Sequence, residues 1–229
     1  MSALSDFDAK LVIVIQDKAA MLSAPERQAF LLEAVSRYSQ DRPLVAAAQI
    51  AGDGGFDYDL PDDWEEGFSD VRQVEYPAGQ QQPEIPDDND WLLYQTKDGK
   101  VLRFLAFSPS ATETILLTYT VRHQASGDGT TVPAADQDAV VNLAGALCCY
   151  ALSRKYAQTS EPSIQADAVN YGSKSGDYAK RGKELEGLYK THIAPAAAEG
   201  GLPGASVTAD WDMNAGWGTD RITHPRRLR

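Results

Sequence analysis

Few residues of this chain have the types and spacing that catalysis or metal binding needs. Its three histidines, His123, His192 and His224, lie far apart, and none belongs to an H-x-x-x-H or H-E-x-x-H pair. Zinc hydrolases use such pairs because they place two metal ligands on one face of a helix. We therefore predict no metal ligands and no metal cofactor.

Other catalytic patterns are incomplete. The string Gly172-Ser173-Lys174-Ser175-Gly176 is too short for a phosphate-binding loop and follows no predicted strand. Asp57-Tyr58-Asp59 lacks the glycine and glutamate of a calcium loop, and the sequence has no G-x-S-x-G elbow. Four carboxylates could in principle support acid–base chemistry: Asp62, Asp63, Glu65 and Glu66. With no apolar pocket evident to raise their pKa values, we expect them to be solvated. The sequence thus predicts no catalytic or cofactor-binding residue and no enzymatic activity.

The negative charge is concentrated in one segment. The formal net charge of the 229 residues is −12, and residues 53–90 hold thirteen acidic side chains against one base, Arg72. The acidic surface that this segment predicts comprises Asp57, Asp59, Asp62, Asp63, Glu65, Glu66, Asp87, Asp88 and Asp90. It is either a solvated face that aids solubility or a surface that repels an anion or meets a basic partner. The acidity disfavours a nucleic-acid reader built on a basic face.

The two cysteines and the hydropathy pattern indicate a reducing compartment. Cys148 and Cys149 are adjacent and cannot form a disulfide framework. They fall within an apolar helical stripe, so we expect them to be buried and unreactive. The longest apolar run, Leu11 to Ile15, is far too short to span a membrane, and the acidic N-terminal stretch does not resemble a signal peptide. We expect the protein to be in the cytoplasm or in a particle assembled there.

The periodicity predicts an α+β protein: a four-helix bundle with a small antiparallel sheet inserted between the second and third helices, plus an extended C-terminal arm. Residues 1–42 are predicted to form a helical hairpin, with capping boxes at Ser5/Asp8 and Ser23/Glu26. Leu31, Ala34, Val35 and Tyr38 then fall at i, i+3, i+4 and i+7, the stripe of an amphipathic helix.

Residues 43–125 form the predicted acidic β insertion. Strands are expected at 44–50, 71–76, 91–94, 101–105 and 115–121, in one antiparallel sheet of four or five strands. The Asp98-Gly99 pair between two apolar runs predicts a hairpin.

Residues 126–193 are predicted to form a second helical hairpin, whose last helix begins at Ser163 or Asp167. Gly172, Gly176 and Gly182 weaken that helix by about 1 kcal/mol each relative to alanine, so packing must hold it. Residues 194–229 form the predicted arm. It contains large aromatic and basic residues suited to contact with a partner or a neighbouring subunit: Trp211, Trp217, Arg221, Arg226, Arg227 and Arg229. Alternatively, the arm folds back on its own domain.

Three strings, together with this order of elements, resemble one protein family. They are LPDDWEEGFSDVRQVEYP from Leu60, LRFLAFSPSATETILLTYTVRH from Leu102, and the stretch from VPAADQDAVVNLAGALCCYALSRKYAQTSEP to ADAVNYGSKSGDYAKRGKELEGLY. The chain resembles, over about residues 5–193, the head-to-tail connector (adaptor) proteins of tailed bacteriophages. The glycines of the last helix depart from the alanine-rich helix of that family.

The resemblance implies a structural protein of the virion at the junction of capsid and tail. Members of that family form a homo-oligomeric ring, commonly of twelve subunits, under the portal protein. The ring extends the DNA channel, contacts passing DNA without sequence-specific binding, and docks the tail or next neck protein; no membrane is involved. The alternatives are another neck, tail-completion or minor capsid protein, a cytoplasmic binding module, or an unrecognised hydrolase.

Overall fold

The computed structural model describes residues 3–17, 19–87, 89–97, 99–158 and 171–194. The chain divides into two units, residues 1–193 and 194–229. Of the second unit only Ala194 belongs to the described residues, so the fold described below is that of the first unit.

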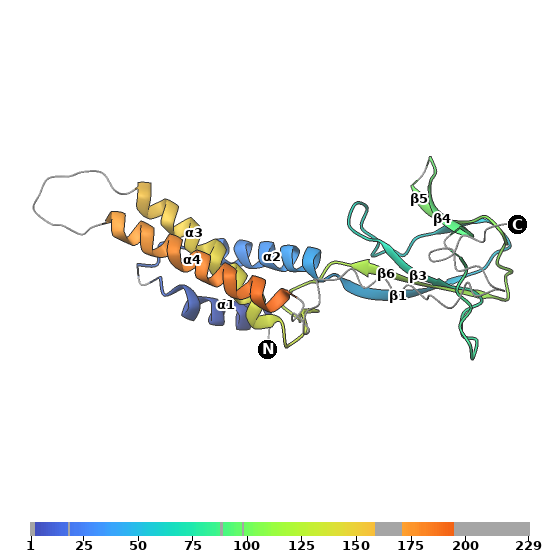
Figure 1. Ribbon diagram of the computed structural model, residues 1–229, viewed down its shortest axis with the longest axis horizontal. Coiled ribbons are helices and arrows are strands. Elements are labelled where there is room, and N and C mark those ends of the chain that lie inside the picture. The colour runs from blue at the N-terminus through green and yellow to red at the C-terminus, as the bar shows by residue number, and fades with distance from the viewer. Residues whose placement is uncertain (1–2, 18, 88, 98, 159–170, 195–229) are drawn as a thin grey trace, which may run out of the picture. The chain divides into compact units, whose positions relative to one another are not determined.

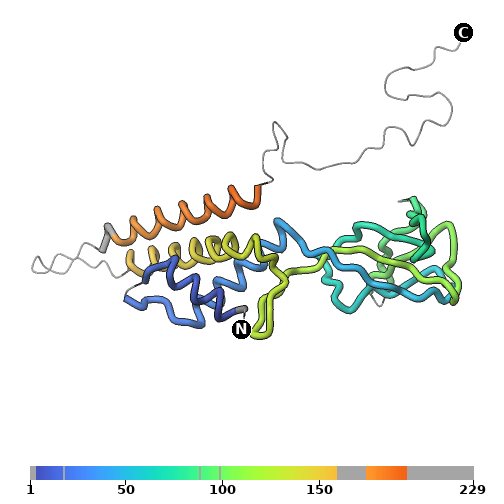
Figure 2. Tube along the Cα trace, turned by 90° about the horizontal axis from the view of Figure 1, so that it is seen from below, coloured from blue at the N-terminus to red at the C-terminus, as the bar shows by residue number. Residues whose placement is uncertain are grey.

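A helix that is buried on several sides organises the helical part. The described residues contain α1 (Ala3–Ile15), α2 (Ala24–Asp41), α3 (Gln137–Gln158) and α4 (Tyr171–Ile193) (Figure 1). The buried residues of α3 include both Val140 and Val141 and both Cys148 and Cys149, which point in different directions around the helix. Such a helix needs neighbours on several sides, and α3 accordingly lies between α4 and the α1–α2 hairpin (Figure 2).

Two apolar clusters fill the two sides of α3. On one side, Leu11 of α1 and Leu31 of α2 pack with Val140 and Leu152 of α3, each at most 1% exposed. On the other, Leu185 of α4 packs against Ala146 and Cys149. The thiols are buried, as the sequence predicts, and burial raises the pKa of Cys148 to about 12 and that of Cys149 to about 11.

One of the two capping boxes predicted from the sequence is present in the structure. The Ser23 amide donates to the Glu26 carboxylate over 2.7 Å at the start of α2, which confirms that box. The Ser5 box is wrong, because α1 already begins at Ala3. Asp8 instead accepts two hydrogen bonds from the guanidinium of Arg27, at 2.8 and 3.0 Å, and so ties α1 to α2.

The glycines do not interrupt α4, which is continuous over Tyr171–Ile193. The predicted starts at Ser163 and Asp167 lie outside the described residues. A Cβ atom built on Gly182 would lie 2.7 Å from the ring of Tyr150 on α3, so glycine is what allows the two helices to approach this closely. Gly176 has no atom within 4 Å of its Cβ position and faces open space.

The insertion between α2 and α3 forms two sheets, and the expectation of a single sheet is wrong. In the first sheet β6 (Thr114–Val121) pairs antiparallel with both β1 (Leu44–Ala51) and β3 (Val71–Glu75). In the second, β5 (Lys100–Phe104) pairs antiparallel with β2 (Asp57–Asp59) and β4 (Trp91–Gln95). The β4–β5 hairpin, in register from Gln95 opposite Lys100, confirms the turn predicted at Asp98-Gly99, although Asp98 itself lies outside the described residues.

The two sheets share one core, which explains why they are separate. Leu102 and Phe104 of β5 pack with Ile115 and Leu117 of β6, all at most 1% exposed. Each sheet has one apolar face and buries it against the other. The sequence pattern did not reveal β2, a three-residue strand inside a turn-rich stretch, whose Tyr58 fills this core.

No helix among the described residues has the length and apolar character that crossing a bilayer requires.

Replacing Gly182 and Gly176 separately with alanine tests the close approach of α3 and α4. Gly176→Ala should raise the free energy of unfolding by about 1 kcal/mol, because alanine favours helix and nothing obstructs the new methyl group. Gly182→Ala should lower it by about 1 kcal/mol, because overpacking against Tyr150 outweighs the gain in helix propensity. Urea unfolding followed by circular dichroism measures both, and equal stabilisation by the two changes would contradict the packing described.

Candidate interaction sites

A buried carboxylate stands where α2, α3 and α4 meet. Asp136, directly before α3, is 6% exposed. It accepts hydrogen bonds from the Tyr38 hydroxyl at 2.5 Å, from Arg42 Nη1 at 3.0 Å and from His192 Nε2 at 2.8 Å. Tyr38 and Arg42 come from the end of α2, and His192 from the last turn of α4. One side chain therefore holds three helices together.

The electrostatics of this cluster favour the ionised carboxylate. Burial alone would raise the pKa of Asp136, but the hydrogen bonds from Tyr38, His192 and Arg42 outweigh it, and the pKa lies below its usual value. Conversely, burial and the neighbouring carboxylate raise the pKa of Tyr38. The phenol therefore stays protonated, as a donor must.

The same cluster fixes the point at which the C-terminal arm leaves the helices. Arg42 Nη2 donates to the carbonyls of His192 and Ile193, at 3.4 and 3.3 Å. The Tyr189 hydroxyl also donates a short hydrogen bond to the Asp41 carboxylate. A cation at the last carbonyls of a helix stabilises that end. Because β1 begins two residues after Arg42, the arm starts beside the first residues of β1.

A buried histidine joins the end of β6 to α2. His123, 7% exposed, has hydrogen-bond partners at both ring nitrogens: Nε2 donates to the Arg42 carbonyl over 3.1 Å, and Nδ1 lies 3.0 Å from the Thr131 carbonyl and 3.1 Å from the Thr131 hydroxyl. Its amide donates to the hydroxyl of Ser39, which in turn donates to the Val35 carbonyl of α2. These contacts give His123 a structural role.

Sequence reasoning missed the Asp136 cluster. Asp136 and its hydrogen-bond partners are separated by up to 98 residues in the sequence, and no motif spans such distances. The available local signal is the position of Asp136 three residues after Pro133, directly before an apolar helical pattern, where a capping acid is common. Its side chain, however, binds Tyr38, Arg42 and His192 instead.

The predicted acidic residues lie in two places. Asp57 and Asp59 belong to β2, and Asp62, Asp63, Glu65 and Glu66 follow it in the loop to β3; all six are exposed. Asp87 and Asp90 form a turn of their own before β4, in which the Asp90 amide donates to the Asp87 carbonyl over 2.8 Å. Asp88 lies outside the described residues.

Folding brings bases to several of these acids. Arg103 of β5 binds Asp57 through two hydrogen bonds, at 2.5 and 2.6 Å, and Arg122 binds Glu65 at 2.6 Å. Lys100 pairs with Glu66 at 3.3 Å, and Asp63 accepts a short hydrogen bond from the Tyr119 hydroxyl. The acidic face is therefore less negative than residues 53–90 alone indicate, because its bases come from strands later in the chain.

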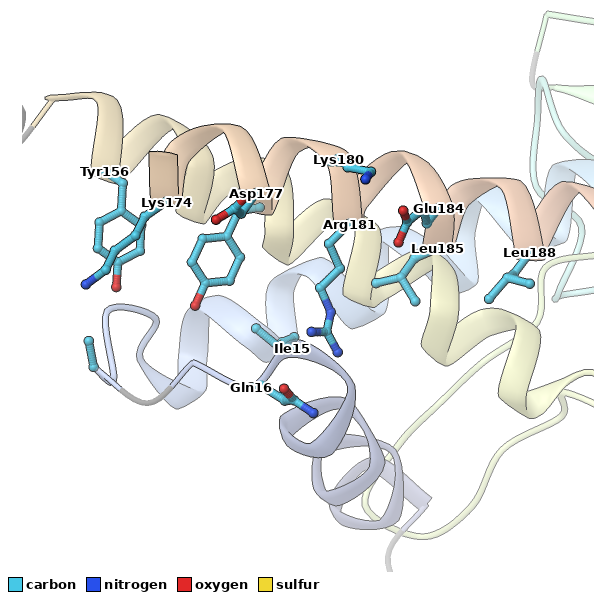
Figure 3. A pocket seen from close by; sticks show the side chains of 12 residues that line it. Ile15, Gln16, Tyr156, Lys174, Asp177, Lys180, Arg181, Glu184, Leu185 and Leu188 are labelled. Carbon is cyan, nitrogen blue, oxygen red and sulfur yellow. The ribbon is translucent and has the colours of Figure 1, made fainter. Parts of the chain in front are cut away.

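A groove of about 700 Å³ lies between α1 and α4 (Figure 3). Ile15, Tyr178, Leu185 and Leu188 contribute its apolar lining, and Leu188 is 57% exposed. Arg181 reaches across it and donates to the Val14 carbonyl in the last turn of α1, over 2.6 Å. Its guanidinium thus caps a helix. The rest of the lining includes the charged side chains of Lys174, Asp177, Lys180 and Glu184.

The arm residues named from the sequence, Trp211, Trp217, Arg221, Arg226, Arg227 and Arg229, lie outside the described residues, as does His224. Within the described ranges, no group of three or more histidine, cysteine or carboxylate side chains could hold a metal ion.

Comparison with known proteins gives weak similarities. No protein-family model and no curated protein matches the chain. A chain from the neck of a native GTA (gene transfer agent) particle with C12 symmetry is 14% identical, with 76% of this chain and 86% of that one covered and a TM-score of 0.27. A chain from the neck of an empty GTA particle with C6 symmetry is 12% identical (76% and 87% covered, TM-score 0.29). A chain from the virion of the native agent is 14% identical (74% and 87% covered, TM-score 0.27). At such scores these likenesses carry no argument about fold or function.

Asp136→Asn tests the cluster at the helix junction. Removing the charge leaves Arg42 and Tyr38 without their ionic partner, and we expect a loss of about 3 kcal/mol in the free energy of unfolding. Asp138→Asn is the matched control, because Asp138 pairs with Lys10 on the surface and is 82% exposed; it should cost less than about 1 kcal/mol. If the two substitutions lowered the free energy of unfolding by similar amounts, the cluster around Asp136 would not stabilise the helix junction.

Acid should weaken the contact between α2 and α3. Lys155 Nζ donates to the Glu26 carboxylate over 2.6 Å. This bond, with those from Ser23, lowers the pKa of Glu26 to about 2. A carboxylate whose pKa is depressed on folding stabilises the protein above its ordinary pKa, and the stabilisation disappears as pH falls from about 4.5 towards 2. As the pH is lowered from 5 to 3, the urea concentration at the midpoint of unfolding should therefore decrease. This decrease should be smaller in Glu26→Gln than in the unaltered protein.

Proposed function

We propose that this protein is a structural head-to-tail connector (adaptor) of a tailed-phage virion, which forms a ring under the portal protein and docks the tail or next neck protein. The observation that carries the proposal is the order of elements. Two helical hairpins, α1–α2 and α3–α4, flank an acidic β insertion, as in the connector family that the sequence strings resemble.

The geometry at the helix junction suits an attachment arm. The arm begins at a point fixed by Arg42 and by the Asp136–His192 pair. An arm with a rigid origin loses less freedom on binding than one that leaves a loose end. In this proposal Trp211 and Trp217 anchor the arm on a neighbouring subunit or on the portal, and Arg221, Arg226, Arg227 and Arg229 add polar contacts.

The charge distribution suits a ring around passing DNA. Every phosphate that a protein neutralises adds affinity through counterion release, and a channel must not retain its cargo. The insertion holds fifteen acidic and five basic side chains between residues 43 and 125, so it would contact DNA without binding it. The same surface could instead meet a basic partner in the tail.

Mass measurement with and without the portal tests this function. The purified full-length chain is mixed with assembled portal rings, and the complex is weighed by native mass spectrometry and imaged by electron microscopy. We expect a closed ring, with twelve copies as the expected number, bound at the tail-facing end of the portal. The arm variant Trp211→Ala/Trp217→Ala should bind more weakly at unchanged thermal stability.

Other outcomes would contradict the proposal. A chain that remains monomeric beside portal rings, and is found elsewhere in the neck or capsid of assembled particles, would be a tail-completion or minor capsid protein. Hydrolysis of generic ester or phosphoester substrates that is lost in variants at Asp62, Asp63, Glu65 and Glu66 would indicate an enzyme.

A further inference from the structure

The first strand of the insertion has an edge that lacks a partner among the described residues. β1 is eight residues long and pairs with β6 alone in the part of the chain that the structure describes. Its sequence, LVAAAQIA, contains no charged residue and no proline. The backbone N–H and C=O groups along such an edge remain free to pair with another strand.

The other strand edges have features that oppose pairing. β2 has three residues, two of them aspartates, and β3 contains Arg72 and Glu75 together with an irregular register between Val71 and Gln73. β4 is uncharged but only five residues long, and the guanidinium of Arg103 lies 3.7 Å from the centre of the Tyr94 ring beside it. Soluble proteins normally protect edges in these ways. The long unprotected edge of β1 therefore indicates a strand that pairs with it in the assembled state.

The two faces of β1 determine which pattern of apolar and polar side chains a partner strand needs. Leu44, Ala46, Ala48 and Ile50 face the shared core and are only partly buried, whereas the residues between them are exposed. The outer face of β1 and β6 carries no charged side chain. A partner strand should therefore place apolar side chains beside the core, and negative charge on its outer face would meet no like charge on β1 or β6.

One segment of this chain outside the described residues has that pattern. In VTADWDM, residues 207–213, the apolar Val207, Ala209, Trp211 and Met213 alternate with polar residues. Strict alternation over seven residues predicts a strand with one buried face. Its polar face carries Asp210 and Asp212, which would point to solvent over the uncharged outer face of the sheet.

The length of the connection favours the β1 strand of a neighbouring copy. The arm starts beside the first residues of its own β1, because Arg42 Nη2 lies 3.3 Å from the Ile193 carbonyl. A link to that strand would need only a few residues. Thirteen residues, 194–206, precede the segment, and they can span about 40 Å when extended, enough to reach the next subunit.

We propose that residues 207–213 of one copy add as a strand to the free edge of β1 in the next copy. Strand addition supplies main-chain hydrogen bonds for affinity and side-chain pockets for specificity. The contact joins two different surfaces of the chain, as closure of a ring requires. The inference rests on the proposed function insofar as it assigns this contact to the connector ring.

Disulfide trapping in the full-length protein tests the contact. One variant carries Ala47→Cys on the exposed face of β1, and separate variants carry Thr208→Cys, Asp210→Cys or Asp212→Cys on the polar face of the segment. The native thiols are both fully buried and stay unreactive. Each arm variant is mixed with Ala47→Cys under mild oxidation and analysed on non-reducing gels. Gln95→Cys, exposed on the edge of β4, replaces Ala47→Cys in the matched control.

We expect at least one arm variant to form a disulfide-linked dimer with Ala47→Cys at least ten times more abundantly than with Gln95→Cys. Double variants that carry Ala47→Cys and one arm cysteine in the same chain are oxidised in parallel. An intramolecular cross-link in a double variant, without any dimer in the mixtures of single variants, would show that the arm binds its own β1, which overturns the proposal. Equal trapping at Ala47 and Gln95 would also overturn it.

Mass measurement of the same samples separates this inference from the proposed function. Rings that assemble on the portal without any cross-link at Ala47 would refute the strand contact and leave the connector function standing. Dimers trapped at Ala47 in a protein that never binds portal rings would support the strand contact and refute the connector function. Absence of both would refute both.

Discussion

The ionised carboxylate of Asp136, buried where three helices meet, is the interaction on which the rest of the structure depends. Tyr38 and Arg42 bring the end of α2 to it, and His192 brings the end of α4. A buried acid is tolerated only when hydrogen bonds and opposite charge replace water, and here they do. Because β1 starts two residues after Arg42, one group determines both where the insertion leaves the helices and where the arm begins.

The distribution of charge shows how folding changes what a sequence segment presents. Residues 53–90 contain a single base, yet Lys100, Arg103 and Arg122 neutralise some of their acids from β5 and from the end of β6. Acidic side chains that have no such partner among the described residues, Asp59 and Asp62 among them, remain exposed. The insertion can therefore form a stable sandwich and still present the negative surface that the connector proposal needs.

Two of the uncovered surfaces expose large apolar side chains, and they lie on different elements. The groove between α1 and α4 exposes Leu188, and the edge of β1 exposes Val45, each 57% accessible. In a protein with a net charge of −12, copies repel one another at long range, and association must come from short-range apolar and main-chain contacts. Such surfaces suit a protein whose role is to contact neighbours, and they tie the proposed arm contact to the proposed ring.

The sequence by itself determined the local elements, because helix and strand periodicity is a property of neighbouring residues. It located the stripe of α2, the alternation of β6, the β4–β5 hairpin and the buried cysteines. Only the tertiary structure decided that the strands form two sheets, that Gly182 accommodates Tyr150, and that Asp136 joins three helices. These depend on partners up to 98 residues apart, which the fold brings together and no local pattern specifies.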